Sequence, residues 1–210
     1  METVAAEPTR RERKMLETRD AIVRAAESLF VEHGFGETTI EQIADRADIA
    51  PRTFFRYFPT KESVLFADAG AKRAALLEAL GARPADEHPF VSLVTVVREL
   101  AVDVSKDWDS FELRQRISRE HASVRDHERT VLECEIGDAL AGFVAERLGV
   151  DVDTDPRPKL WAGISMATFR VAFHVWLERG KKGSLSAAVE RAMDAAAEAL
   201  GALSAAEAPR

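Results

Sequence analysis

The sequence predicts an all-α protein, and three observations support that class. Hydrophobic residues form 46% of the 210-residue chain but aromatic residues only 7%, and alanine is used heavily. Alanine and long unbranched side chains lose little entropy in a helix, so this composition favours packed helices over a sheet. Apolar residues also recur at helical spacing along most of the chain. No stretch of adequate length shows the alternation of a strand.

The N-terminal part of the chain begins with a polar segment and one long helix. Residues 1–14 are polar and contain four basic residues after Pro8, so we expect a flexible basic arm. A helix from about Lys14 to His33 follows, because apolar residues repeat there at helical spacing. Gly34 is placed to end that helix.

Two short helices joined by a tight turn are expected within residues 38–58. Thr38 and Glu41 match a capping box that begins the first of them. Pro51 suits the first turn of the second, which ends before Pro59. This arrangement predicts a three-helix domain with a helix-turn-helix at 15–62.

The remaining residues, 63–210, predict a second helical domain. Thr60 caps a fourth helix that runs to about Leu80, where Gly81 and Pro84 interrupt the pattern. Longer helices are then expected near 89–105, 110–121, 123–148, 157–179 and 184–203.

The charge of the chain is distributed unevenly. The net charge is −7, which argues against a protein whose whole surface binds nucleic acid. The segment from Ile49 to Lys61, however, contains Arg52 and Arg56 and no acidic residue. A helix fits the major groove of DNA and a local basic patch neutralises phosphates, so the second short helix is a candidate recognition helix.

Residues 15–66, about a quarter of the chain, resemble the DNA-binding domain of the TetR family of transcriptional regulators. The resemblance rests on Arg19, Ile22, Ala25, Ala26, Leu29, Phe30, Gly34, Phe35, Thr38, Thr39, Ile43, Ala44, Ala47, Ile49, Thr53, Phe55, Tyr57, Phe58, Lys61, Glu62 and Leu65. It implies a homodimer of all-helical subunits whose variable C-terminal domain binds a ligand and dimerises. It also implies repression of transcription that a small molecule relieves.

The resemblance implies a set of residues that bind a double-stranded DNA operator. They are Thr38, Thr39, Arg52, Thr53, Phe54, Arg56, Tyr57 and Lys61. Arg52 and Thr53 are the candidates for contacts to base edges, and Arg56 suits either a base or a phosphate. Tyr57 and Lys61 are expected to hold phosphates.

Three further expectations concern the same region. Thr39 offers a hydroxyl and a backbone N–H to phosphate. Two of Phe54, Phe55 and Phe58 should anchor the recognition helix in the core, with Phe54 the candidate for a thymine methyl. For the basic residues 10–14, a minor-groove or phosphate role and a solvated surface both stay open.

The chain departs from the family pattern at three positions. Asp48 stands where a turn glycine is expected before Ile49, and it can adopt a left-handed conformation at modest cost. Ala50 replaces a hydroxyl cap. Arg52 replaces a small glycine and puts a long donor at the start of the recognition helix. This last departure bears on which operator is bound but not on DNA binding itself.

The two helices near 157–179 and 184–203 have the character of a dimer interface. The second carries an apolar stripe of Leu185, Val189, Ala192, Met193, Ala196, Leu200 and Leu203. The resemblance implies a four-helix bundle with the same helices of the partner subunit. Packing within one subunit is the alternative.

A small, mainly apolar effector is expected to bind in the second domain. The candidate lining residues combine aromatic, aliphatic and hydroxyl side chains: Trp108, Phe111, Ile117, Phe143, Trp161, Ser165, Thr168, Phe169 and Ala172. Ordinary core packing is the alternative for each. The C-terminal half also resembles regulators of the mycofactocin type, which implies an acyl-CoA as one candidate ligand. Arginines between 110 and 130 could hold an anionic head group or form a solvated surface.

Other classes of function fit less well. The histidines lack metal-ligand spacing, and the chain has no nucleophile elbow and no phosphate-binding glycine loop, so we expect neither an enzyme nor a bound metal or cofactor. The apolar run Leu160–Leu177 contains Arg170 and His174, which predicts a buried helix rather than a membrane span. A cytoplasmic protein is therefore expected. A helical protein-binding adaptor and a DNA-binding protein without ligand control stay open as alternatives.

Overall fold

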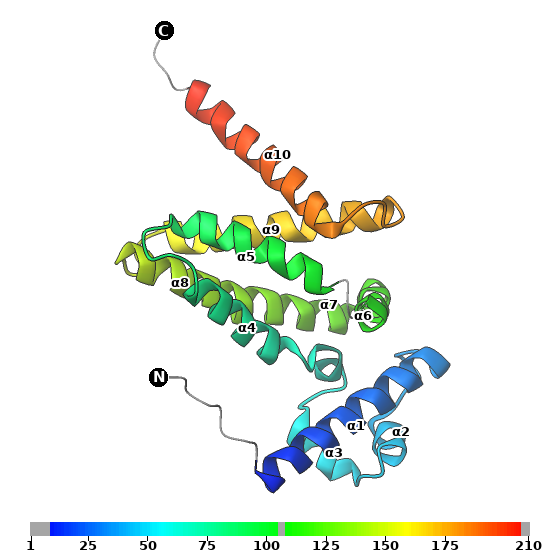
Figure 1. Cartoon of the computed structure of the whole chain (residues 1–210). Helices are drawn as coiled ribbons and strands as arrows, with labels where there is room; N and C mark the ends of the chain where they lie inside the picture. The colour runs from blue at the N-terminus through cyan, green and yellow to red at the C-terminus, as the bar shows by residue number, and fades with distance from the viewer. Residues whose placement is uncertain (1–8, 105–107, 207–210) are drawn as a thin grey trace. The chain divides into compact units, whose positions relative to one another are not determined.

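The computed structural model describes the backbone of residues 9–104 and 108–206, and their side chains except those of 100–104, 132–133 and 199–206. Every regular element in the described part is a helix, which confirms the all-α class (Figure 1). The chain forms two compact units. The first contains residues 1–68 and 109–128, and the second contains 69–108 and 129–210.

The first helix of the first unit, α1, spans Arg10–His33. It begins four residues before the predicted start because Thr9 and Glu12 form a capping box. The Glu12 N–H donates to Thr9 Oγ1 over 3.3 Å, and the Thr9 N–H donates to Glu12 Oε2 over 2.7 Å. Basic residues 10–14, expected in a flexible arm, are therefore helical. Gly34 ends α1 at φ 83°, as predicted.

The other elements of the first unit come from two separate parts of the chain. They are α2 (Ile40–Arg46), α3 (Pro51–Tyr57), the 3-10 helix η1 (Glu62–Phe66), α6 (Trp108–Glu120) and α7 (Ala122–Arg129). The Phe35 ring lies 5.0 Å from the His121 ring, and Phe66 lies 5.1 Å from His127. These contacts place 109–128 with the first unit, whereas the sequence had put everything after residue 62 in the second.

The single helix predicted from Thr60 to Leu80 is divided into η1 and α4 (Ala69–Gly81). The Ser63 N–H donates to Thr60 Oγ1 over 3.2 Å, so Thr60 does cap the segment. The three successive side chains of residues 64–66 are all buried. One face of a surface α-helix cannot bury three consecutive residues, so packing against the first unit interrupts the helix here.

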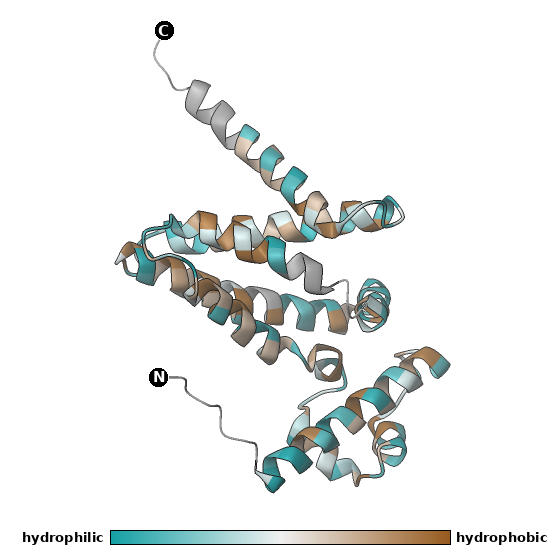
Figure 2. Cartoon of the chain, in the orientation of Figure 1, coloured by the Kyte–Doolittle hydropathy of each residue, from teal (hydrophilic) through white to brown (hydrophobic). Residues whose placement is uncertain are grey.

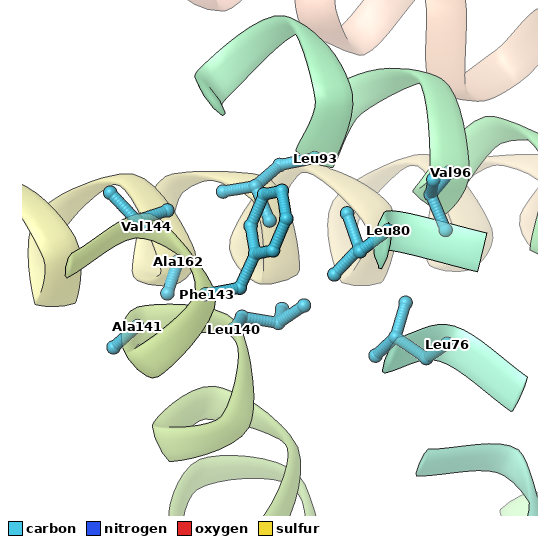
Figure 3. Packing of buried hydrophobic residues seen from close by; sticks show 9 residues of the cluster. All are labelled: Leu76, Leu80, Leu93, Val96, Leu140, Ala141, Phe143, Val144 and Ala162. Atoms are coloured by element: carbon cyan, nitrogen blue, oxygen red, sulfur yellow. The ribbon is translucent and has the colours of Figure 1, made fainter. Parts of the chain in front are cut away.

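The second unit packs its helices around one apolar core. Its elements are α4, α5 (Pro89–Val104), the π-helical segment η2 (Thr130–Gly137), α8 (Asp138–Leu148), α9 (Arg157–Glu178) and α10 (Leu185–Ala206). The helix predicted over 123–148 is thus α7, η2 and α8 in succession. Figure 3 shows the core, which consists of Leu76, Leu80, Leu93, Val96, Leu140, Ala141, Phe143, Val144 and Ala162. Burial of each leucine, valine or phenylalanine side chain stabilises a fold by about 1.5–3 kcal/mol.

Among the described residues, α9 is the one helix long and apolar enough to cross a membrane. Its mean hydropathy is 1.2, and 33% of the apolar stretch is buried inside the protein. The helix packs against α5, α8 and α10. These contacts are those of a core helix, so length and composition alone are weak evidence for a membrane span.

Candidate nucleic-acid interface and effector region

The helix-turn-helix begins with α2, whose first turn is capped by Thr39. The Gln42 N–H donates to Thr39 Oγ1 over 3.2 Å, and the Thr39 N–H donates to Gln42 Oε1 over 2.8 Å. The capping box is therefore one residue later than the predicted Thr38–Glu41 pair. Thr39 is exposed, but its backbone N–H, which was expected to reach phosphate, donates within the capping box.

A turn at Asp48 separates α2 from α3. Asp48 has a φ of 52°, which is the left-handed conformation expected of this residue in place of glycine. The Ile49 N–H donates to the Ala44 carbonyl over 3.0 Å, which closes the end of α2. Pro51 occupies the first turn of α3, and Ala50 before it supplies no side-chain cap. Local chemistry thus fixes the break between the two helices.

Helix α3 is anchored by two phenylalanines and exposes a third. Phe54 is fully buried and Phe58 nearly so, with ring centroids 5.8 Å apart. Phe55 is 56% exposed. The prediction that two of the three rings lie in the core is therefore correct, but Phe54 is wrong as the ring that reaches a thymine methyl. Phe55 is the aromatic residue on the accessible face.

The accessible face of α3 is cationic. Arg52 and Arg56 are exposed, and Thr53 between them is half-buried. Arg56 donates to Tyr57 Oη over 3.1 Å, and its guanidinium carbon lies 5.0 Å from the centre of the Tyr57 ring. Burial by itself would raise the pKa of Tyr57. Hydrogen bonds with Arg56 and Thr18 and the charges of Arg56 and Lys14 outweigh burial and lower that pKa.

Two residues predicted to bind DNA have other partners inside the first unit. Thr38 is buried, and its hydroxyl donates to the Gly34 carbonyl over 2.8 Å. Lys61 Nζ donates to the carbonyls of Phe35 (2.6 Å) and Thr38 (2.8 Å). Burial lowers the pKa of Lys61. Both side chains fix the α1–α2 loop, so the structure does not support the DNA contact expected of Thr38 or the phosphate contact expected of Lys61.

An ion pair fixes the C-terminal end of α2 on α1. Arg46 donates to the Glu32 carboxylate through two nitrogens, over 2.6 and 2.8 Å. Ser28 Oγ donates to the same carboxylate over 2.6 Å. The hydrogen bonds from Arg46 and then Ser28 lower the pKa of Glu32 to about 2. Two parallel hydrogen bonds fix the orientation of Arg46 relative to the Glu32 carboxylate more strictly than a single bond would.

These contacts leave α3 with a buried anchor and an exposed face that carries two arginines, one aromatic ring and no acid. Cations on a helix that projects from a folded unit suit the major groove of DNA.

Comparison with known proteins supports a DNA-binding role for this surface. Residues 22–67 match the family model "Bacterial regulatory proteins, tetR family", and residues 87–201 match "MftR C-terminal domain". The HTH-type transcriptional regulator TcmR of Streptomyces glaucescens is 34% identical over 196 residues, which cover 89% of this chain and 86% of that protein. The chain belongs to the TetR family. It is thus a helix-turn-helix transcriptional regulator and not an enzyme.

Solved structures of other repressors have the same fold. FadR of Thermus thermophilus, a TetR-family repressor in complex with lauroyl-CoA, has a TM-score of 0.56 and 25% identity over 84% of this chain and 91% of its own. SmeT of Stenotrophomonas maltophilia, in complex with triclosan, has a TM-score of 0.58 and 22% identity over 85% of this chain and 90% of its own. Because SmeT is only 22% identical to this chain, its similarity concerns the fold alone.

The residues predicted to line an effector pocket in this TetR-family chain lie in several places. Phe111 and Ile117 belong to the first unit, and the other seven belong to the second. Phe143 is a core residue of the second unit. Trp161 lies 4.9 Å from the His88 ring. The predicted set therefore does not form one continuous lining within either unit.

A separate aromatic cluster lies within the second unit, where Trp108 packs against residues of α9. Trp108 packs edge-on against Trp176 at 5.3 Å, and Phe173 stacks with Phe169 at 6.4 Å. Lys181 Nζ lies 3.8 Å from the centre of the Trp108 ring. Cations at such distances are attracted by the ring face. Trp108 and Phe169 thus meet in one cluster through Phe173, which the sequence had not singled out.

The two hydroxyl groups of α9 that were expected to hold a ligand form hydrogen bonds with backbone carbonyls of α9 itself. Ser165 Oγ donates to the Ala162 carbonyl over 2.8 Å, and Thr168 Oγ1 donates to the Ile164 carbonyl over 2.7 Å. Ala172 is buried. One surface depression lies at the α9–α10 turn and another between α1 and α6, and neither of these is lined by the predicted set.

Helices α9 and α10 each present an incompletely covered apolar face. On α9, Leu160, Val171 and Val175 are 56%, 54% and 41% exposed. On α10, the predicted stripe is buried at its start but only half-buried at Met193 and Ala196. Figure 1 shows α10 leaving the other helices of the second unit after its first turns. The side chains of residues 200 and 203 in that stripe lie outside the described residues.

Proposed function

We propose that this TetR-family regulator is a dimeric, ligand-responsive repressor that binds a palindromic operator through α3. The observation that carries the proposal is the exposed face of α3, where Arg52, Phe55 and Arg56 project while Phe54 is buried. Arginine forms two-point hydrogen bonds with guanine, and an apolar side chain contacts the thymine methyl. The face thus combines both means of direct base recognition.

A symmetric dimer is the second part of the proposal. Regulators of this family bind DNA as dimers. The exposed apolar residues Leu160, Val171 and Val175 on α9 support an interface there, together with the half-buried stripe on α10. A two-fold dimer places two copies of α3 about one helical turn apart, roughly 34–36 Å, so its operator is an inverted repeat.

A small, mainly apolar effector in the second unit is the third part. The aromatic cluster at Trp108, Phe169 and Trp176 supports it, because aromatic walls next to the cation of Lys181 suit an apolar ligand with an anionic end. FadR of Thermus thermophilus is a TetR-family repressor in complex with lauroyl-CoA, which supports acyl-CoA as one candidate.

The effector would act by preferring the conformation that does not bind DNA. A ligand with equal affinity for both conformations shifts no population. A 100-fold loss of operator affinity requires about 2.7 kcal/mol of coupling free energy. The internal hydrogen bonds of Ser165 and Thr168 favour a rival function, a DNA-binding protein without ligand control. We propose a cytoplasmic location for either form, because a bacterial regulator meets its DNA there.

One experiment tests the core of the proposal. Selection from random duplexes should yield an inverted repeat, and its affinity should fall steeply with salt because bound phosphates release counterions. Binding of no duplex, or a salt-independent affinity, would contradict the proposal and favour a protein-binding adaptor.

The effector part of the proposal is tested by adding lauroyl-CoA to the complex of the protein with its operator. Release of DNA from the wild type but not from Phe169→Asp, with equal operator affinity in the absence of ligand, supports effector control. A panel of acyl-CoAs and apolar metabolites that changes neither thermal stability nor operator affinity contradicts it.

A further inference from the structure

The first turns of α1 carry a dense group of cations. Arg10, Arg11, Arg13 and Lys14 are all exposed, in a chain whose net charge is −7. Glu12 is the acid within this run. The Thr9 backbone N–H donates to its carboxylate, which lowers the pKa of Glu12 and occupies it in the helix cap. Figure 2 shows this end of α1 as strongly hydrophilic.

This cationic end lies next to the last residue of α3. Thr18 Oγ1 donates to the Lys14 carbonyl over 2.8 Å. The guanidinium carbon of Arg19, the next residue of α1, lies 5.0 Å from the centre of the ring of Phe58, which directly follows Tyr57. Thr18 and the positive charge of Lys14 both help to lower the pKa of the Tyr57 hydroxyl. Arg56 completes the group by donating to Tyr57 Oη. The positive surface therefore continues from α3 through Tyr57 to the first turns of α1.

Helical geometry separates the cations of α1 into two faces. Arg11, Lys14 and Thr18 follow the i, i+3, i+7 spacing and share the face that meets Tyr57. Arg13 and Arg24 are eleven residues apart, about three turns, and share another face. Arg24 lines the depression between α1 and α6, on that second face. The two pairs have equal charge but different neighbours.

We propose that Arg11 and Lys14, next to Tyr57, form an extension of the DNA interface that holds backbone phosphates beside the bases contacted by α3. This inference rests on the proposed DNA-binding function. Two features support it: the charge complements the phosphate backbone, and the patch is continuous with α3. The pair precedes residues 22–67, which match the family model.

Phosphate contacts of this kind give affinity and fix position but no sequence preference. The test compares two double variants of the full chain, Arg11→Gln with Lys14→Gln and Arg13→Gln with Arg24→Gln. Operator affinity is measured over a series of salt concentrations. Loss of two phosphate contacts in each subunit of a dimer should lower the slope of log affinity against log salt by about 3–4 for the first variant. The Arg13/Arg24 control should retain the wild-type slope.

Two further measurements complete the test. Hydroxyl-radical footprints should lose protection of the flanking backbone only in the Arg11/Lys14 variant, and its preference among operator bases should be unchanged. If both variants have the thermal stability of the wild type, their fold is intact. An unchanged slope, or the same fall in both variants, would overturn the inference. A wild type that binds no DNA would instead refute the proposed function, so the two failures are distinguishable.

Discussion

The ammonium of Lys61 lies 4.2 Å from the centre of the Phe35 ring and donates a hydrogen bond to the Phe35 backbone carbonyl. A second hydrogen bond to the Thr38 carbonyl completes the contact. Lys61 thus connects the segment after α3 with the α1–α2 loop. The residue maintains the geometry of the DNA-binding unit from inside it.

We predict that Lys61→Met destabilises the protein without removing a phosphate contact. Two part-buried carbonyls lose their donor, which should cost about 1–3 kcal/mol in the free energy of unfolding. Denaturant unfolding measures this cost. The salt dependence of operator binding should stay unchanged, whereas Arg56→Gln should lower it. A lower salt slope in Lys61→Met at unchanged stability would show that Lys61 holds phosphate after all.

Phe54 and Phe55 should respond to alanine in opposite ways. Phe54→Ala removes a fully buried ring and should cost about 3–5 kcal/mol of stability. Phe55→Ala removes a ring that is 56% exposed and should change stability little. If Phe55 contacts a thymine methyl, its variant should lose operator affinity and preference at that base pair. Thermal unfolding and binding to single-base operator variants separate the two effects.

Arg52 should contribute to sequence preference and Tyr57 to general affinity. Arg52→Ala should lose on the order of 1–3 kcal/mol at the operator and relax preference at one base pair per half-site. Tyr57→Phe should weaken operator and random DNA alike, because a hydroxyl on phosphate carries no sequence information. Competition binding measures both. Equal losses on operator and random DNA in Arg52→Ala would make Arg52 a phosphate contact.

The Glu32–Arg46 ion pair predicts a pH dependence in the first unit. The pKa of Glu32 is lowered from 4.5 to about 2 in the folded protein, so the folded state binds fewer protons than the unfolded chain between these values. The stabilisation is therefore fully present above pH 4.5 and is lost as the pH falls towards 2. The difference in Tm between wild type and Glu32→Gln should shrink over that range. A constant difference would contradict the assignment.

The exposed face of α9 predicts a variant that separates folding from dimerisation. Val171 is 54% exposed within the subunit, so Val171→Glu should fold but place a carboxylate in the proposed apolar interface. Sedimentation should then show a monomer with wild-type helix content. Arg191→Glu, at an exposed position of α10, is the charge-changing control and should stay dimeric. A dimeric Val171→Glu would place the interface elsewhere.

Local signals in the sequence were sufficient for the helix class and for the helix-turn-helix. Gly34, Asp48 and Pro51 act on the backbone within a turn of their own position, so their effects follow from residue type alone. The family resemblance of residues 15–66 added that this unit binds DNA. The structure confirmed the break at Asp48 and the end of α1 at Gly34.

Tertiary structure decided which side of each helix faces solvent. Phe54, Phe55 and Phe58 are the same type of residue, and only packing within the first unit distinguishes the buried Phe54 from the exposed Phe55. Lysine often binds phosphate, but Lys61 donates its hydrogen bonds to the backbone carbonyls of Phe35 and Thr38, which are far away in sequence. The same holds for 109–128, which join the first unit through ring contacts. Spacing along a chain specifies a helix and its period, whereas the partners of a side chain depend on which distant segments fold against it.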